Sequence, residues 1–88
     1  MSNFGLTVQQ YERLFTNQNG LCAICKQPEC TVRNGKIKKL AVDHDHVTGK
    51  VRGLLCSHCN TAIGLFKDDI ATMSLAVAYL LNPIPDIT

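Results

Sequence analysis

Two Cys-x-x-Cys pairs, Cys22/Cys25 and Cys56/Cys59, restrict the possible fold of this chain more than any other feature. Thirty residues separate the pairs, and each tight turn can direct two thiolates towards one point. This is the arrangement of a tetrahedral structural zinc site. A redox dithiol would instead be expected at a helix start within a βαβ pattern, which the sequence lacks. The spacing therefore predicts Zn²⁺ held by all four cysteines.

Cys30 and His58 are alternative ligands, but either would break the symmetry of the two pairs, and we expect Cys30 to be a free thiol in a loop. With 88 residues, the chain is near the lower limit at which a hydrophobic core suffices, so the metal should supply stability. The odd cysteine count and a start without a basic, apolar leader predict a reducing, cytoplasmic setting. No apolar stretch reaches the ~20 residues that span a bilayer, so no membrane partner is expected.

Local signals in the first half of the chain predict a helix and a hairpin turn. Thr7-Val8-Gln9-Gln10 has the form of a capping box, which predicts a helix over about residues 7–18. Asn34-Gly35 favours a tight hairpin turn. Apolar residues at helical spacing in the first helix should form its buried stripe; they are Val8, Tyr11, Leu14 and Phe15.

A C-terminal helix is predicted over about residues 68–82, with an acidic start suited to a helix N-terminus. One face of this helix is apolar and consists of Ile70, Met73, Val77, Leu80 and Leu81. We expect this face to cover the core, with a homodimer surface as the alternative.

Four consecutive ionisable residues, Asp43-His44-Asp45-His46, follow a short apolar run, Leu40-Ala41-Val42. In isolation they are equally consistent with a solvated polar turn. Val51 to Leu55 predicts a second, antiparallel strand, in which Gly53 permits a close backbone approach or a bulge. The cluster should then lie in a hairpin loop, and Asn60 should open a short helix that ends at Leu65.

The order strand, Asp-His loop, strand and helix, tethered by zinc ligands, brings Asn60 back beside Asp43 and His44. Oxygen atoms of Asp43 and Asn60 suit a hard cation such as Mg²⁺, which takes few protein ligands. Neutral His44 can then accept a proton from a water that attacks a phosphodiester.

Basic residues surround this cluster although the net charge is only +2. Between Arg33 and Arg52, six lysines and arginines stand against two aspartates, which gives that segment +4. Such a field suits a polyanion such as nucleic acid, although an ordinary lysine-rich loop would have the same composition. The candidate DNA contacts are Lys38, Lys39, Lys50 and Arg52.

Asp43-His44-Asp45-His46 and the run from Gly49 to Asn60, GKVRGLLCSHCN, resemble the recombination endonuclease VII family. These are phage-type nucleases of the His-Me (ββα-metal) finger, or HNH-like, superfamily. The likeness extends from the Leu6-Thr7 helix through Asn19 to Cys25 and on to Tyr79-Leu80-Leu81. It implies metal-dependent hydrolysis of DNA phosphodiesters, and the founding member cuts branched DNA, including four-way junctions.

The resemblance implies structural zinc at the four cysteines, catalytic Mg²⁺ (or Mn²⁺ in its place) at Asp43 and Asn60, and His44 as general base. His46 would contact the scissile phosphate or assist His44. Two departures stand out. The loop after Asp43-His44 is shorter than in the founding member, and the chain stops where that enzyme continues into a region used for dimerisation and junction binding. A simpler, HNH-type nicking nuclease is therefore also consistent.

We therefore expect a small α+β fold, a single domain over residues 1–88. Its core, over about residues 38–66, would be a zinc-stabilised ββα-metal unit with one helix on each side in sequence. The expected function is a Mg²⁺-dependent DNA endonuclease that acts in the host cytoplasm if a phage encodes it. The alternative is a non-catalytic zinc module that binds nucleic acid or protein, because such a module needs the cysteines but not Asp43, His44 or Asn60.

Overall fold

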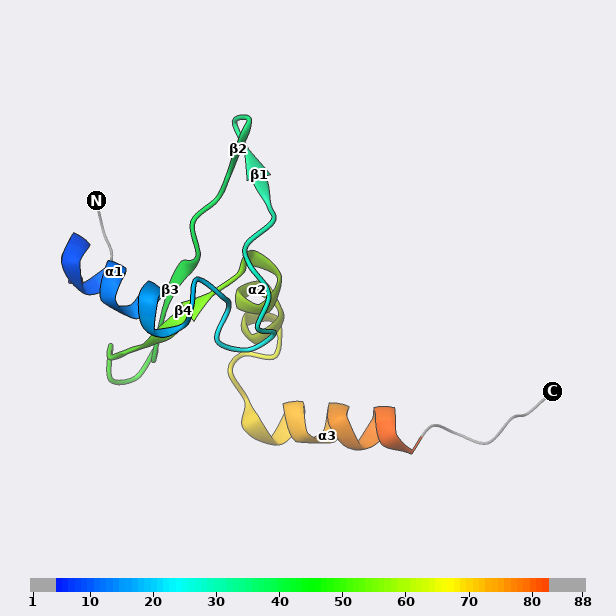
Figure 1. The fold of residues 1–88 in the computed structure, drawn as a ribbon. Helices are drawn as coiled ribbons and strands as arrows, with labels where there is room; N and C mark the ends of the chain where they lie inside the picture. The colour runs from blue at the N-terminus through cyan, green and yellow to red at the C-terminus, as the bar shows by residue number, and fades with distance from the viewer. Residues whose placement is uncertain (1–4, 83–88) are drawn as a thin grey trace.

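The computed structural model describes residues 5–82 and shows a small α+β fold (Figure 1). Three helices and two two-stranded antiparallel sheets make up these residues. The outermost residues of the predicted 1–88 domain lie outside this range. The elements, in chain order, are α1 (Val8–Asn17), β1 (Val32–Arg33), β2 (Lys36–Ile37), β3 (Ala41–His44), β4 (Val51–Leu55), α2 (Ser57–Leu65) and α3 (Ile70–Leu81).

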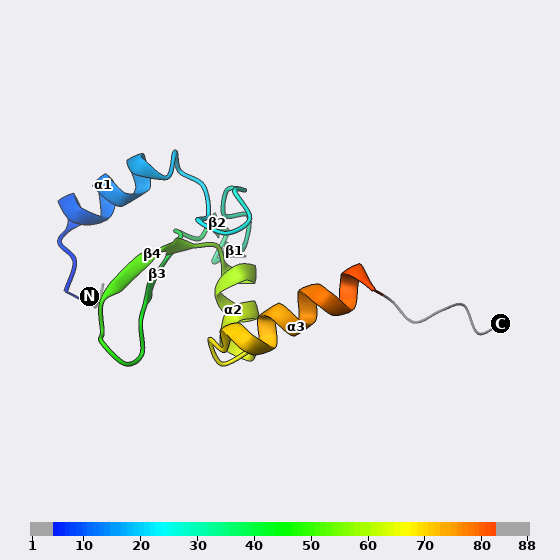
Figure 2. The same cartoon turned by 90° about the horizontal axis from the view of Figure 1, so that it is seen from below.

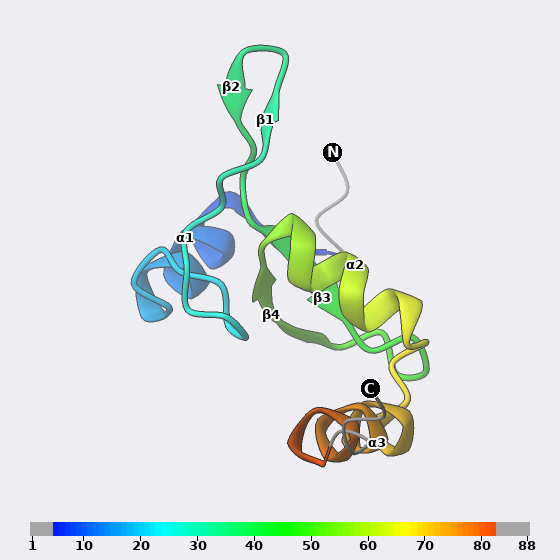
Figure 3. The same cartoon turned by 90° about the vertical axis from the view of Figure 1, so that its right-hand side faces the viewer.

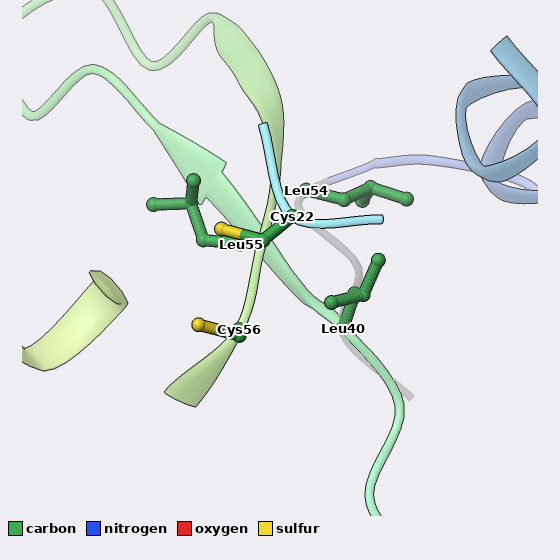
Figure 4. Packing of buried hydrophobic residues seen from close by; sticks show 5 residues of the cluster. All are labelled: Cys22, Leu40, Leu54, Leu55 and Cys56. Atoms are coloured by element: carbon green, nitrogen blue, oxygen red, sulfur yellow. The ribbon is translucent and has the colours of Figure 1, made fainter. Parts of the chain in front are cut away.

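The β3–β4 hairpin lies at the centre of the molecule, and the buried core gathers at one of its ends. Ala41 pairs with Leu55 there, next to the second cysteine pair. Figure 4 shows the sulfur atoms of Cys22 and Cys56 pointing to the same side of the strands. The buried apolar residues among those described are Cys22, Leu40, Leu54, Leu55 and Cys56. Because this core is so small, the fold needs further reinforcement.

Helix α1 begins with the capping box expected from the sequence. The Gln10 backbone N–H donates to the Thr7 hydroxyl oxygen at 3.1 Å, and the Thr7 backbone N–H donates to the Gln10 side-chain oxygen at 2.8 Å. The Tyr11 hydroxyl donates to the Leu40 carbonyl at 2.6 Å and docks the helix on the hairpin. The predicted buried stripe is only half right: Tyr11 and Leu14 pack against the core. Val8 and Phe15 are 60% and 42% exposed, because a two-stranded hairpin is too narrow to cover the whole helix face.

Gln18, the C-cap of α1, ties this helix to β4. Its side-chain oxygen accepts from the Leu54 N–H at 3.0 Å, and its side-chain nitrogen donates to the Leu54 carbonyl at 3.0 Å. The Ala23 N–H donates to the same carbonyl, also at 3.0 Å. At Gly53 the sequence predicts a close backbone approach or a bulge. A register shift lies directly beside Gly53, and a β-carbon there would lie 3.3 Å from the Gln18 side-chain oxygen.

Helix α2 begins at Ser57, so the prediction that Asn60 opens it is wrong. The Cys56 sulfur acts as the N-cap and accepts from the Cys59 N–H at 3.4 Å. The buried Glu29 carboxylate accepts the Ser57 N–H at 2.9 Å and also its hydroxyl. A negative charge on the first N–H groups of a helix stabilises that end, so the helix starts inside the second cysteine pair.

Helix α3 extends away from the rest of the fold (Figure 2), which contradicts its predicted role as core cover. Ile70, Val77, Leu80 and Leu81 are 77%, 57%, 76% and 74% exposed. The physical reason is the linker, in which two successive residues before the Asp69 N-cap have positive φ and turn the chain away from the core. No described helix is both long and apolar enough to cross a membrane.

Candidate metal centre and active site

The two Cys-x-x-Cys pairs meet, as their spacing predicts. The sulfur atoms of the four cysteines all lie within 4.8 Å of one another; these are Cys22, Cys25, Cys56 and Cys59. The sulfur atoms of Cys25 and Cys56 are 3.8 Å apart, and four ligands about 2.3 Å from a tetrahedral zinc ion would be separated by about 3.8 Å. Cys30 lies outside the cluster. The four thiols therefore form a site that suits zinc.

The ionisation of the four thiols is linked to the binding of a cation. Burial opposes ionisation of Cys22, but backbone N–H groups of Cys56, Cys25 and Ile24 lower the pKa of its thiol to about 6. Burial and the neighbouring sulfur atoms raise the pKa of the Cys59 thiol to about 12. Without a positive charge between them, the four groups cannot all ionise at neutral pH. Metal binding supplies that charge and displaces the protons.

At the other end of the hairpin, a β-bulge sets the positions of the charged residues. Asp43 pairs with Gly53 and His44 pairs with Val51, which leaves Arg52 as an extra residue in β4. Bulges re-aim side chains, and here the guanidinium of Arg52 points back to β3. Asp43 and His44 are therefore the last residues of β3 and do not lie in the loop, contrary to the prediction.

Arg52 binds Asp43 through a two-pronged ion pair. Its Nε donates to Asp43 Oδ2 at 2.7 Å and its Nη2 donates to Oδ1 at 3.0 Å. The hydrogen bonds that Arg52 donates to the Asp43 carboxylate raise the pKa of the Arg52 guanidinium, although burial acts in the opposite sense. The side chains of Asp43 and Arg52 are 12% and 37% exposed. Arg52, expected only as a DNA contact, therefore also holds Asp43 in place.

The two histidines of the motif lie beside each other, with ring centroids 5.1 Å apart. His46 is 71% exposed at its side chain, and its Nε2 lies 3.3 Å from Asp68 Oδ2. The same oxygen lies 3.3 Å from Arg52 Nη2. Asp68 was missed by the sequence reasoning, because it lies outside the motif and resembles the ordinary acidic start of a helix.

Asp45 has a structural role. Its Oδ1 accepts the N–H groups of Val47 and Thr48 at 2.7 and 2.9 Å. These hydrogen bonds lower the pKa of the Asp45 carboxyl, and the bond from Thr48 has the largest effect. Asp45 thus fixes the turn between β3 and β4.

Asn60 lies in the first turns of α2, which packs against β3 (Figure 3). Its side chain is exposed, and its contact with Asp43 stays a prediction. Among the basic candidates, Lys39 and Lys50 are exposed and Lys38 is half-buried. The predicted Asn34-Gly35 hairpin is present: β1 and β2 pair antiparallel around it, and both turn residues have positive φ.

The fold thus combines four cysteines that could hold zinc, at one end of the β3–β4 hairpin, with a cluster of charged residues at its other end. The sequence profile of recombination endonuclease VII matches residues 1–82, so the chain belongs to that family. It is similar to the Gene 59 protein of Mycobacterium phage L5, with 44% identity over 94% of this chain and 48% of that protein. The Gene 59 protein of Mycobacterium phage D29 is 43% identical over the same shares.

The chain thus spans about half the length of these curated relatives. No solved structure matches it. The family is described as that of recombination endonuclease VII.

Proposed function

We propose that the chain is a metal-dependent DNA endonuclease whose β3–β4–α2 unit is a ββα-metal (His-Me finger) site stabilised by structural zinc. The observation that carries this proposal is the bulged end of the hairpin. There Asp43, His44, His46 and Arg52 gather at one edge, two of them in direct contact. Family membership over residues 1–82 supports the same reading.

The donor set suits the catalytic cation expected from the sequence. The Asp43 carboxylate and the Asn60 amide oxygen are hard ligands of the kind that Mg²⁺ or Mn²⁺ takes. Arg52 donates one hydrogen bond to each Asp43 oxygen. Because each carboxylate oxygen has two lone pairs, one lone pair on each oxygen remains for a cation. When bound, the ion supplies charge that polarises the phosphoryl group and stabilises the leaving 3′ oxygen.

The remaining chemistry falls to side chains of this chain. His44, at the end of β3, accepts a proton from the attacking water, which requires its neutral form. His46 and Arg52 provide donors to the scissile phosphate. Lys38, Lys39 and Lys50 bind the DNA backbone without reading its sequence. Branched DNA or simple nicking substrates are both consistent with these groups.

A non-catalytic zinc module is the second candidate. One observation favours it: both Asp43 oxygens already accept hydrogen bonds from Arg52. An aspartate neutralised in this way needs no cation to offset its charge.

Cleavage assays separate the two candidates. The zinc-loaded chain is incubated with supercoiled plasmid and with four-way branched DNA, in Mg²⁺, in Mn²⁺ and in EDTA. The nuclease proposal predicts cutting with either ion and none in EDTA. Absence of cutting on every DNA form, combined with DNA binding in a gel-shift assay, would establish the binding module instead.

A further inference from the structure

A cavity of about 580 Å³ opens between the β3–β4 loop and the corner that joins α2 to α3. His46 and Arg52 line it from the hairpin, and Asp68 lines it from the corner. Ile63 and Met73 form part of its apolar wall. Nothing in the sequence motif gives Asp68 a function, yet Asp68 contacts two residues assigned here to phosphate binding.

One oxygen of Asp68 serves both partners. Oδ2 lies 3.3 Å from His46 Nε2 and 3.3 Å from Arg52 Nη2. The Asp68 side chain is only 20% exposed, whereas that of His46 is 71% exposed. A shielded carboxylate therefore holds an imidazole that has little packing of its own. The negative charge of Asp68 therefore lies next to Nε2 of the His46 ring.

The backbone fixes where Asp68 stands. Lys67 and Asp68 have φ values of 56° and 57°, in the left-handed region that side-chain-bearing residues adopt only under constraint. Two hydrogen bonds maintain the turn: the Lys67 N–H donates to Gly64 and the Asp68 N–H donates to Ile63, both at 2.9 Å. The carboxylate is thus attached to the end of α2 by a strained, hydrogen-bonded corner.

Arg52 is held on two sides. Asp43 binds its Nε and Nη2 from β3, and Asp68 binds Nη2 from the corner. Without Asp68, Arg52 would keep the Asp43 pair, but its outer edge and the His46 ring would lose their common anchor.

We propose that Asp68 is a positioning residue of the nuclease site, because its carboxylate orients the His46 ring and the outer edge of Arg52 towards the scissile phosphate. The inference rests on the proposed nuclease function. Since Asp68 acts through His46 and Arg52, its loss should lower the rate of the bound complex more than it weakens DNA binding.

The test compares Asp68→Asn with Asp69→Asn in the full chain. Both remove one negative charge from adjacent positions, but Asp69 accepts hydrogen bonds from Ala71 and Thr72 and caps α3. We expect Asp68→Asn to lower kcat roughly ten- to a hundredfold, with KM unchanged or lower, as for other residues that orient reacting groups. Asp69→Asn should stay within about twofold, because asparagine also caps helices well. Asp68→Glu should recover part of the rate.

Equal kcat values for the two asparagine variants would overturn the proposal. A second readout does not depend on cleavage: ¹H–¹⁵N spectra of the imidazole rings. Asp68→Asn should shift the His46 ring resonances and leave those of His58 unchanged. If the wild-type chain cuts no DNA, the nuclease function fails, and unshifted His46 resonances would then overturn the positioning role independently.

Discussion

The two ends of the β3–β4 hairpin use polar groups in opposite ways. At the end where Ala41 pairs with Leu55, the side chains of Cys56, Glu29 and Gln18 point inwards and bind backbone groups or other sulfur atoms. At the end where His44 pairs with Val51, the charged side chains form a partly exposed network around an open cavity.

This difference separates stability from chemistry within one short hairpin. Zinc at the four cysteines, with the hydrogen bonds around them, would compensate for a core of few buried residues. The residues at the bulged end bury little apolar surface, so their side chains contribute less to stability and are available for chemistry. Substitutions at the first end should therefore destabilise or unfold the chain, whereas those at the second should leave a folded but inactive protein.

The largest effect is expected at the metal centre. Cys56→Ser should remove a zinc ligand but keep an N-cap for α2, because serine caps helices well. The chain should still lose cooperative folding, because structural zinc contributes about 10–16 kcal/mol in small zinc domains. Metal analysis and circular dichroism provide the measurement. Cys30→Ser is the matched control and should retain one zinc and the native spectrum. A folded Cys56→Ser protein would show that the core suffices without the site.

Asp43→Asn should have the next largest effect, on cleavage alone. Loss of the carboxylate should lower the rate roughly a hundredfold or more at fixed Mg²⁺, because charge stabilisation by the bound ion amounts to several kcal/mol. A titration of rate against Mg²⁺ concentration should shift to higher concentrations. Asp69→Asn serves as the control with the same charge change. A rate equal to that of wild type would remove Asp43 from the site.

Glu29→Gln should cost about 2 kcal/mol of unfolding free energy, because both carboxylate oxygens accept hydrogen bonds and the new amide NH₂ would face N–H donors. Glu29 accepts from Ser57 through one oxygen and from Cys30 and Thr31 through the other. Urea titrations measure the change, and Glu12→Gln on exposed α1 is the control.

The same variant has a predictable pH dependence. Burial opposes the charge of Glu29, but hydrogen bonds from Ser57, Thr31 and Cys30 outweigh it and lower the pKa of the carboxyl. The stabilisation is therefore complete above the ordinary glutamate pKa of about 4.3 and is lost as pH falls through the lower folded value. The difference in unfolding free energy between wild type and Glu29→Gln should therefore shrink as the pH falls below about 4.3. A constant difference would mean that the charge of Glu29 is unimportant.

The smallest effects are expected for the lysines. Changing Lys38, Lys39 and Lys50 to alanine, one at a time, should weaken DNA binding a few-fold and reduce the salt dependence by about one unit of slope per phosphate contact. Binding titrations at several salt concentrations test this, with Arg13→Ala on α1 as control. An unchanged slope would place that lysine outside the DNA interface.

Sequence reasoning identified what depends on short-range patterns. The Thr7 capping box is local and is confirmed, and the four cysteines meet across thirty-one positions because two Cys-x-x-Cys pairs form a recognisable ligand pattern. It failed where contacts join distant residues that belong to no such pattern. Glu29 sets the start of α2 at Ser57 across twenty-eight positions, and Asp68 reaches Arg52 across sixteen. The apolar face of α3 shows a related limit, since helical spacing reveals a face but not what lies against it.

The most direct test of the account is His44→Ala, measured for both folding and cleavage in one preparation. The account predicts a fall of roughly 10²–10⁴ in single-turnover rate, as for loss of a general base, with the urea midpoint and zinc content unchanged. His58→Ala, an exposed histidine outside the cysteine cluster, should cut at the wild-type rate. Unimpaired cutting by His44→Ala, or loss of rate together with loss of fold, would contradict the division between the two ends of the hairpin.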